Sequence, residues 1–186
     1  MQIKKELRKQ LLLSRSRIQG DERTALSEMI AERLFRVREF READSVFCYI
    51  NKENEISTEK IVSHCLSEGK NVAAPVCVGE EMVFKLIKSA DDLEKGSFSV
   101  YEPKNYCEAA IASPDTVCIT PALCFDPRGY RIGYGKGFYD RFFDKNECVK
   151  IGLCFDDYIR DFNPDVNDKA VDIIVTESKI IRLPLL

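Results

Sequence analysis

The sequence predicts one Rossmann-like, three-layer α/β domain over residues 1–186, with a mostly parallel sheet flanked by helices. Three observations carry this prediction. Short apolar runs alternate with amphipathic helical segments along the chain. No repeat, low-complexity run or linker divides the 186 residues, a length that suits one continuous core. A glycine-rich segment directly follows one of the predicted strands, where open α/β sheets bind ligands.

Two helices are predicted at the start of the chain. The first, over residues 3–18, carries apolar residues on one side and basic residues on another. Asp21 is expected to cap the second helix, which runs to about Phe40. The apolar positions of this helix keep helical spacing, and they are Leu26, Met29, Ile30, Leu34 and Val37.

Strands and helices then alternate. The first strand is expected over residues 45–50, and Ser57 is predicted to cap a helix over 58–68 that ends at Gly69. A weakly patterned stretch over 89–113 is predicted to be a loop with short extended pieces. The other expected elements are strands over 71–76, 82–87, 116–120, 149–155 and 171–175, and a helix from about Gly135 or Gly137 to Lys145.

The segment over residues 126–140, DPRGYRIGYGKGFYD, holds four of the nine glycines. Glycines at 133, 135 and 137 permit positive φ and let backbone N–H groups approach phosphate oxygens closely. Lys136 adds a positive charge, and Asp140 is placed to hold a hard cation on the same phosphates. An ordinary turn is the competing interpretation, and it suits Gly129 best.

Neither standard nucleotide fingerprint describes this segment. A Walker A loop requires serine or threonine after its lysine, but Gly137 follows Lys136. The dinucleotide fingerprint requires glycine where Lys136 or Asp140 stands. The segment nevertheless lies between a predicted strand and a helix start, a position whose free N–H groups and helix dipole attract anions.

Composition and charge exclude several classes of function. A net charge of −3 leaves no basic surplus for nucleic acid, and no run of 18 apolar residues occurs. The eight cysteines form no CxxC and several lie in apolar runs, so disulfides and zinc are disfavoured. With His64 as the only histidine, thiol–imidazole catalysis is disfavoured too. We expect a cytoplasmic monomer without nucleic-acid or membrane partners.

Charged residues elsewhere in the chain are weaker candidates. Lys4 and Arg8 share one face of the first helix, with Arg15 near the same stripe, and they could clamp an anion or form a solvated basic face. Glu53 and Glu55 follow the first strand on the side expected for ligands.

The carboxylates near the end of the chain are similarly ambiguous. Asp168 and Asp172 flank Val171, and Asp172 stands just ahead of the apolar run 173–175. Together with Asp140, Asp172 could complete a two-carboxylate Mg²⁺ site. From spacing alone, a surface loop is the stronger interpretation of Asp168 and Asp172, just as a solvated face is for Lys4 and Arg8.

The chain resembles the 5-formyltetrahydrofolate cyclo-ligase family, also called methenyltetrahydrofolate synthetase, over nearly its whole length. Four stretches carry the resemblance: KKELR at 4–8, the loop around Glu55 to Thr58, TPALCFDPRGYRIGYGKGFYDRF at 120–142, and NDKAVDIIVTE at 167–177. The third is highly specific. Ala122, where glycine is expected, and Asn167, where histidine is frequent, depart from the family pattern outside the phosphate loop.

The resemblance implies conversion of 5-formyltetrahydrofolate to 5,10-methenyltetrahydrofolate with MgATP, releasing ADP and phosphate. It also implies roles for single residues, with Lys136 and Arg131 at the transferring phosphate. The implied ATP contacts are Lys4, Lys5, Glu6, Leu7, Arg8, Arg131, Ile132, Gly133, Tyr134, Gly135, Lys136, Gly137, Phe138 and Tyr139. The implied folate contacts are Ile50, Glu55, Tyr134, Gly135, Lys136, Gly137 and Phe138, and the implied Mg²⁺ ligands are Asp140 and Asp172.

Two other functions stay open. One is an ATP-dependent ligase or kinase on the same scaffold that acts on another N-acyl or pterin compound, because the substrate pocket and not the fold decides the substrate. The other is a non-catalytic nucleotide- or folate-binding protein. The presence of both implied Mg²⁺ ligands and of the implied cationic residues argues against a protein that only binds, because binding alone has less need of these charges.

Overall fold

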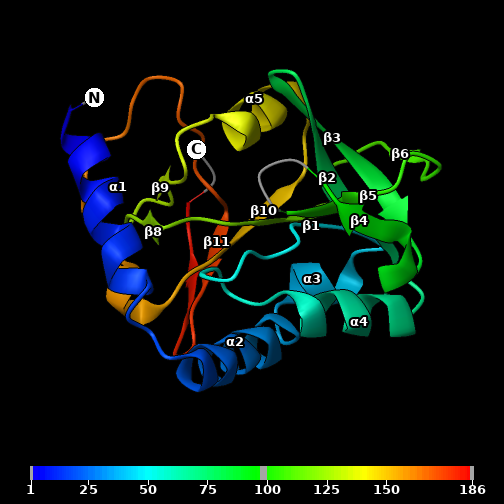
Figure 1. The fold of residues 1–186 in the computed structure, drawn as a ribbon, viewed down its shortest axis with the longest axis horizontal. Helices are drawn as coiled ribbons and strands as arrows, with labels where there is room; N and C mark the ends of the chain where they lie inside the picture. Colours follow the sequence, from blue (N-terminus) through cyan, green and yellow to red (C-terminus); the bar gives the residue numbers. More distant parts are fainter. Residues whose placement is uncertain (1, 97–99, 185–186) are drawn as a thin grey trace.

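A computed structural model describes residues 2–96 and 100–184, with side chains from Lys4 onward. Its centre is an eight-stranded sheet of order β12-β11-β10-β7-β1-β2-β3-β6 (Figure 1). The strands are β1 (Ser45–Cys48), β2 (Asn71–Val78), β3 (Glu81–Ile87), β6 (Ala109–Ala110), β7 (Val117–Thr120), β10 (Val149–Leu153), β11 (Ile173–Val175) and β12 (Ile180–Arg182).

The five central strands, from β11 to β2, run parallel to their neighbours. β12, β3 and β6 pair antiparallel at the two edges. The predicted mostly parallel sheet is therefore confirmed. Residues 97–99 of the loop predicted over 89–113 lie outside the described part of the chain. Its described residues form short pieces, namely a 3-10 turn (Ala90–Asp92), β6, and the two-stranded ribbon of β4 (Leu93–Lys95) and β5 (Tyr101–Pro103).

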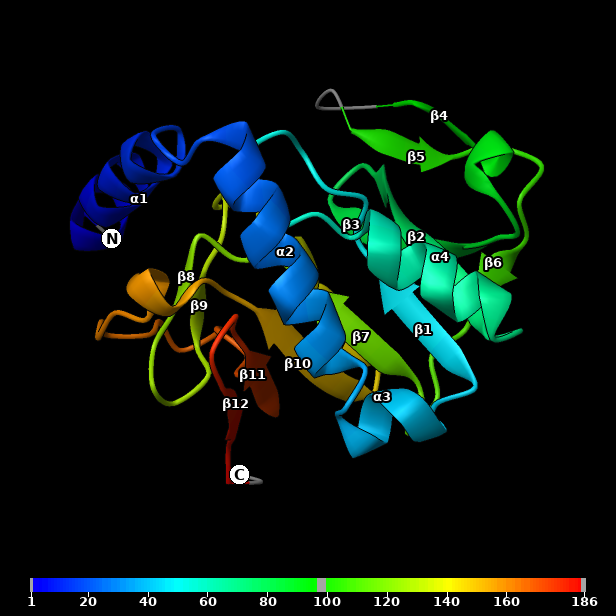
Figure 2. The ribbon, with the colours of Figure 1, turned by 90° about the horizontal axis from the view of Figure 1, so that it is seen from below.

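Helices cover both faces of the sheet and thereby form three layers. α5 (Phe138–Lys145) lies on one face, and α2 (Gly20–Leu34), α3 (Arg38–Glu42) and α4 (Glu59–Ser67) lie on the other (Figures 1 and 2). α1 (Gln2–Arg15) lies apart from these layers, beside the small hairpin of β8 (Cys124–Phe125) and β9 (Arg131–Ile132). The two views agree that α1 covers the end of the sheet toward which the parallel strands point.

Side-chain alternation along the central strands divides the core in two. Val46 and Cys48 of β1 belong to the larger apolar cluster with α2 and α4, whereas Phe47 belongs to the smaller cluster with α5. The ring of Phe47 stacks on Phe84 at 4.6 Å, and Phe142 of α5 lies 4.9 Å from Phe84. Because successive strand residues point to opposite faces, one short apolar run supplies both layers.

Several details of the predicted helices were wrong. The first helix, expected to reach residue 18, ends at Arg15. The helix expected to reach Phe40 ends at Leu34, and Val37 is extended before α3 begins. This break brings Leu34, Val37 and Phe40, three residues apart, into the core together. Asp21 lies in the first turn of α2 and not at its cap, because the helix begins at Gly20.

The predicted cap of α4 is also displaced by one residue. Thr58 is the N-cap, and Ser57 instead donates its backbone N–H to Ser27 Oγ of α2 at 3.0 Å. Gly69 has φ +73 directly after α4, as expected for a glycine that ends a helix. β12 was not predicted.

The surroundings of the cysteine thiols and of His64 bear on whether they could act in catalysis. All eight cysteines are free, and burial raises the pKa of Cys65 to about 12 and that of Cys124 to about 11. His64 stacks on Phe35, with 4.0 Å between ring centroids. Cys148 differs, because its hydrogen bond with Cys118 lowers its pKa, but it too is buried. Among the described helices, none has both the length and the apolarity to span a membrane.

Candidate active site

The sheet topology brings two loops together at one edge. β1 lies between β2 and β7, and the chain leaves β1 toward β2 but leaves β7 toward β10 on the opposite side. The connections that follow β1 and β7, residues 49–58 and 121–137, therefore diverge from neighbouring carboxyl ends. Such a divergence leaves a crevice outside the strand ends, which is the usual ligand site of open α/β sheets.

The loop after β7 begins with the β8–β9 hairpin, and buried Asp126 organises its turn. The Asp126 carboxylate accepts the backbone N–H groups of Arg128 and Tyr130, each at 2.9 Å, and Nε of Arg128 at 2.7 Å. Gly129 takes φ +91 in this turn, and a Cβ there would meet Leu183 at 2.3 Å. Gly129 thus lies in a turn, which is the interpretation that the sequence favoured for this glycine.

The glycines at 133–137 are not equivalent. Gly135 and Gly137 have φ of +89 and +69, whereas Gly133 is not in the positive-φ region. Gly137 is the N-cap of α5, so the helix begins at Phe138, close to the predicted start. Lys136 lies between the two positive-φ glycines with an exposed side chain. Backbone N–H groups, a helix N-terminus and a cation are therefore adjacent in this loop.

Gly135→Ala is expected to destabilise the protein by about 1–2 kcal/mol, because an L-residue in left-handed backbone clashes with itself. The added Cβ would also lie 3.1 Å from Cζ of Arg8. Gly133→Ala is the matched control, since nothing lies within 4 Å of its Cβ position and its φ is not positive. Urea unfolding of both variants measures the difference, and equal losses in the two would contradict this assignment of strain.

Arg131 and Asp140 form an anchored ion pair beside the loop. Nη2 of Arg131 donates to Asp140 Oδ1 at 2.7 Å, and Nη1 donates to the carbonyl of Lys169 at 2.8 Å. The backbone N–H of Lys169 donates to the same Oδ1 at 3.0 Å. The Arg131 side chain is only 5% exposed, and its guanidinium lies over the rings of Tyr139 and Phe143. Asp140 is thereby fixed in the first turn of α5.

Asp172 lies directly before β11 and is held by the neighbouring strand. Its Oδ2 accepts the backbone N–H of Lys150 at 2.7 Å, and Oδ1 lies 3.3 Å from Lys150 Nζ. Lys150 and Arg131 both approach the ring of Phe143, at 6.0 and 5.4 Å. The two predicted metal ligands are thus each paired with a cation that lies near this ring.

The donor set fits a cation that is held largely by phosphate. Both hydrogen bonds to Asp140 use Oδ1, so Oδ2 is the oxygen it could offer to Mg²⁺. Asp172 fits less well, because Lys150 engages both of its oxygens. Within residues 2–96 and 100–184, no group of three or more His, Cys, Asp or Glu side chains could hold a metal by itself.

The predicted cations of α1 both face inward. Nε of Arg8 donates to the carbonyl of Gly133 at 2.7 Å, which places the guanidinium against the glycine loop. Lys4 is 2.9 Å from Asp165 and also pairs with Asp168. Burial lowers the pKa of Lys4, but the hydrogen bonds to these two aspartates outweigh it and raise the pKa overall. Lys4 and Arg8 therefore connect α1 to two separate parts of the site.

Helical periodicity places the residues between Lys4 and Arg8 on different faces of α1. Leu7 packs against the larger core cluster, whereas Lys5 and Glu6 are exposed. Any contact of Lys5 or Glu6 with a ligand therefore requires that ligand to extend around the outer side of α1.

Glu55 and Tyr134 join the two loops. Glu55 is 7% exposed, and its Oε2 accepts the backbone N–H of Lys52 at 2.7 Å. Burial, followed by the charge and hydrogen bond of Glu55, raises the pKa of Tyr134. Nζ of Lys52 lies 4.6 Å from the centre of the Tyr134 ring. Ile50 packs against the core at the base of this contact, and Glu53 is exposed.

The aromatic residues after the loop pack inward. Phe138 and Tyr139 belong to the edge of the smaller core cluster, and Tyr139 lies 5.8 Å from Phe143. These contacts make both side chains part of the packing of α5 against the sheet. Sequence reasoning missed Lys52, Lys150 and Lys169, whose positions beside the predicted residues depend on chain segments that only the fold brings together.

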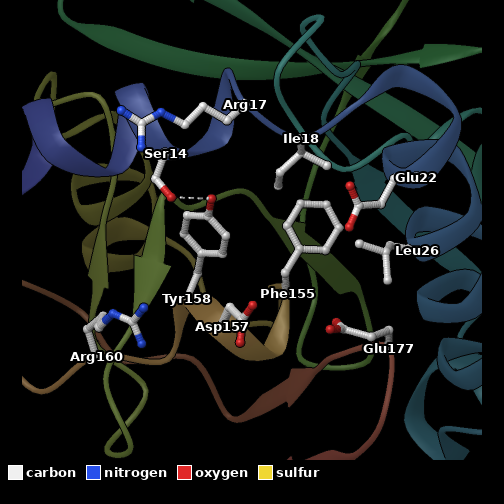
Figure 3. Close-up of a pocket in the computed structure, with 10 residues that line it drawn as sticks. All are labelled: Ser14, Arg17, Ile18, Glu22, Leu26, Phe155, Asp157, Tyr158, Arg160 and Glu177. Atoms are coloured by element: carbon white, nitrogen blue, oxygen red, sulfur yellow. Dashed lines mark hydrogen bonds between the residues drawn. The ribbon is translucent and has the colours of Figure 1, made fainter.

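A cavity of about 500 Å³ lies at the other end of α1 (Figure 3). None of the predicted site residues lines it. Arg17, Phe155 and Tyr158 are among its walls, and the hydroxyl groups of Tyr158 and Ser14 are hydrogen bonded at 2.9 Å.

Comparison with known proteins agrees with the resemblance seen in the sequence. A model of the 5-formyltetrahydrofolate cyclo-ligase family matches residues 1–177. A Schizosaccharomyces pombe protein named "Probable 5-formyltetrahydrofolate cyclo-ligase" is 27% identical over 173 residues, covering 82% of this chain and 84% of that protein. A Caenorhabditis elegans protein of the same name is 26% identical and covers 97% of this chain and 95% of its own.

Solved structures give the same answer. The NMR structure of Aquifex aeolicus 5,10-methenyltetrahydrofolate synthetase superposes with a TM-score of 0.88 and 30% identity, covering 99% of this chain and 94% of that one. A Mycoplasma pneumoniae 5,10-methenyltetrahydrofolate synthetase, at 21% identity and a TM-score of 0.75, shares the fold. With the family match spanning nearly the whole sequence, the chain belongs to the 5-formyltetrahydrofolate cyclo-ligase family.

Proposed function

We propose that this protein converts 5-formyltetrahydrofolate to 5,10-methenyltetrahydrofolate while ATP is split to ADP and phosphate. The observation that carries the proposal is the meeting of two loops at one sheet edge. The glycine loop with Lys136 and Arg8 suits a polyphosphate, and Glu55 lies against Tyr134 of that same loop. A phosphate donor and a nitrogen-rich ring could therefore be bound side by side.

The proposed chemistry begins at the formyl oxygen, which is a poor leaving group until it is phosphorylated. This oxygen attacks the γ-phosphorus of ATP, the bond to the bridging oxygen breaks, and ADP leaves. The formyl carbon then carries a phosphate and a double bond to N5. N10 attacks this carbon and loses its proton, and phosphate departs with the C–O bonding pair as the five-membered ring closes.

In this proposal the protein positions the reactants and neutralises charge. Backbone N–H groups of residues 133–137 and the start of α5 face the phosphates, while Lys136, Arg8 and Lys4 balance their charge. Arg131 fixes Asp140 and adds positive charge behind the transferring phosphate. Little covalent assistance is needed for phosphoryl transfer, so the proposal assigns no role to the thiols, seven of which are buried.

A magnesium ion fits this arrangement through Oδ2 of Asp140, with Asp172 joining it if Lys150 is displaced. When bound, Mg²⁺ would neutralise phosphate oxygens and hold them for in-line transfer. The residues of the chain supply the orientation, because Arg131 and Lys169 fix the Asp140 carboxylate independently of any metal.

The direct test is turnover by the purified protein. With MgATP and (6S)-5-formyltetrahydrofolate, we expect the absorbance of 5,10-methenyltetrahydrofolate to appear with equal amounts of ADP and phosphate. Omission of either substrate should abolish the signal. If no product forms, and ATP is split only when another N-acyl or pterin compound is added, the proposed substrate is wrong.

A further inference from the structure

The two halves of α1 are attached to the domain in different ways. In the carboxyl-terminal half, Leu11 and Arg15 are buried, with exposures of 5% and 1%. In the amino-terminal half, the described attachments are the partly buried Leu7, the ion pairs of Lys4 and the hydrogen bond from Arg8 to the glycine loop. The positions of Lys4 and Arg8, both proposed ATP contacts, therefore depend on the groups that hold this half.

Asp168 is the better placed of the two carboxylates that pair with Lys4. Its side chain is 20% exposed, whereas that of Asp165 is 59% exposed. Oδ2 of Asp168, the oxygen that pairs with Lys4, also accepts the backbone N–H of Asp165 at 2.8 Å. The backbone N–H of Asp168 donates in return to the carbonyl of Asp165 at 3.0 Å. Because these bonds fix the Asp168 carboxylate in a turn and solvent screens it less, Asp168 is the stronger anchor of Lys4.

The residue after Asp168 continues the connection to the phosphate side of the site. The backbone N–H of Lys169 donates to Asp140 Oδ1 at 3.0 Å, and its carbonyl accepts Nη1 of Arg131 at 2.8 Å. Figure 1 shows this segment, in orange, passing from beside α1 toward the start of α5. Adjacent residues of one segment therefore hold α1 by a side chain, and hold Asp140 and Arg131 by the backbone.

The Lys4 ammonium keeps capacity for a ligand. Within the described residues its acceptors are Asp165 and Asp168, which take two of its three N–H donors. The Lys4 side chain is 13% exposed, so the ammonium is not sealed in the core. A lysine side chain has many rotamers in solution, and the two carboxylates select the one that is present here.

We propose that Asp168 is a positioning residue for the MgATP half of the site. It holds Lys4, and with it the amino-terminal half of α1, at a fixed place relative to Asp140. Lys4 and Arg8 then meet the nucleotide phosphates already oriented, and binding does not have to order them. Asp168 acts through Lys4 and does not itself contact the nucleotide. This inference rests on the proposed function, since it assumes that ATP binds between α1 and the glycine loop.

The expected effect is on nucleotide affinity. Asp168→Ala removes the anchor of Lys4, so the Kd for the Mg²⁺ complex of a non-hydrolysable ATP analogue, measured calorimetrically, should rise about tenfold, the scale of one hydrogen bond between charged groups. With saturating MgATP, kcat should stay within about threefold of the wild type, because Lys136 and Asp140 are unchanged. The Kd for 5-formyltetrahydrofolate should stay within about twofold, since the contacts of Asp168 lie on the nucleotide side.

Three further variants test whether Asp168 acts through Lys4. In a Lys4→Met background, Asp168→Ala should raise the analogue Kd by less than about twofold further, because the group that it holds is absent. Asp168→Asn keeps an acceptor oxygen for Lys4 and for the backbone N–H of Asp165, so its Kd should rise less, by about threefold. Asp161→Ala is the matched control and should leave the Kd unchanged, since Asp161 is 87% exposed in the same connection and lies 3.5 Å from Arg128.

Three results would overturn the role of Asp168: an unchanged analogue Kd in Asp168→Ala, a full additional loss in the Lys4→Met background, or a fall in kcat with no change in Kd. If Asp168→Ala does not fold, Asp168→Asn is judged by the same measurements, and a wild-type Kd or an unfolded chain in that variant refutes the role.

Failure of the proposed function is recognised separately. A wild type that binds the analogue but forms no 5,10-methenyltetrahydrofolate refutes the function and leaves the role of Asp168 in nucleotide binding measurable. Wild-type binding that Asp168→Ala leaves intact refutes only the role of Asp168. A wild type that does not bind the analogue refutes both.

Discussion

Lys136→Met lowers kcat by about 100-fold or more while the protein stays folded, which is the scale of losing one preorganised charge partner of a transition state. Lys136 is exposed between two positive-φ glycines, so the core does not depend on its side chain. Methionine keeps a long, unbranched side chain but has no charge for the transferring phosphate. The loss should therefore appear in turnover and not in stability.

Steady-state rates with saturating MgATP and 5-formyltetrahydrofolate, together with thermal unfolding, measure both quantities. Lys145→Met is the matched control, because Lys145 is an exposed lysine at the far end of α5 that pairs with Glu81 at 2.8 Å. It should retain kcat within about twofold, since exposed ion pairs contribute little. Wild-type turnover in Lys136→Met would remove this residue from the phosphate site.

The sheet and the glycine loop were predictable because their signals are local. Apolar runs such as the one at Val46 identify buried strands, and the position of the loop after β7 follows from the order of elements. The extent of α2 was not predictable in this way. Leu34, Val37 and Phe40 fit a continuous helix by pattern, and only packing against the sheet decides that the chain breaks between them.

For the candidate site, the sequence indicated candidate residues but not the contacts that they make. Asp140 and Asp172 were both predicted as metal ligands, and Arg131 was noted in the same segment as Asp140. Their other partners, Lys169 and Lys150, come from other segments of the chain. Nothing in the spacing of these residues encodes the pairing of β10 with β11 that brings Lys150 to Asp172. Contacts of this kind depend on strand register, which a single sequence does not display.

Asp140→Asn is expected to lower kcat/KM by about 100-fold or more and to raise the Mg²⁺ concentration needed for half-maximal rate. Asparagine can keep its amide oxygen at the Oδ1 position, where it still accepts from Arg131 and Lys169. The amide nitrogen then replaces Oδ2, which is the oxygen proposed to face the cation. The substitution thus removes charge and a metal ligand while it retains the local geometry.

The stability of Asp140→Asn distinguishes a role in metal binding from a role in holding Arg131. Stability should also fall, because Arg131 is only 5% exposed and loses its counter-charge in Asp140→Asn. We expect a loss of only about 1 kcal/mol, since Asp140 is 26% exposed and solvent screens part of the pair. Asp144→Asn is the control, since Asp144 lies one turn later on α5 and pairs with the same Lys169 at 2.7 Å, but is 66% exposed. It should change neither turnover nor Mg²⁺ dependence. If Asp140→Asn loses stability but keeps its wild-type rate and Mg²⁺ dependence, Asp140 serves only as the anchor of Arg131, and the cation must be held elsewhere.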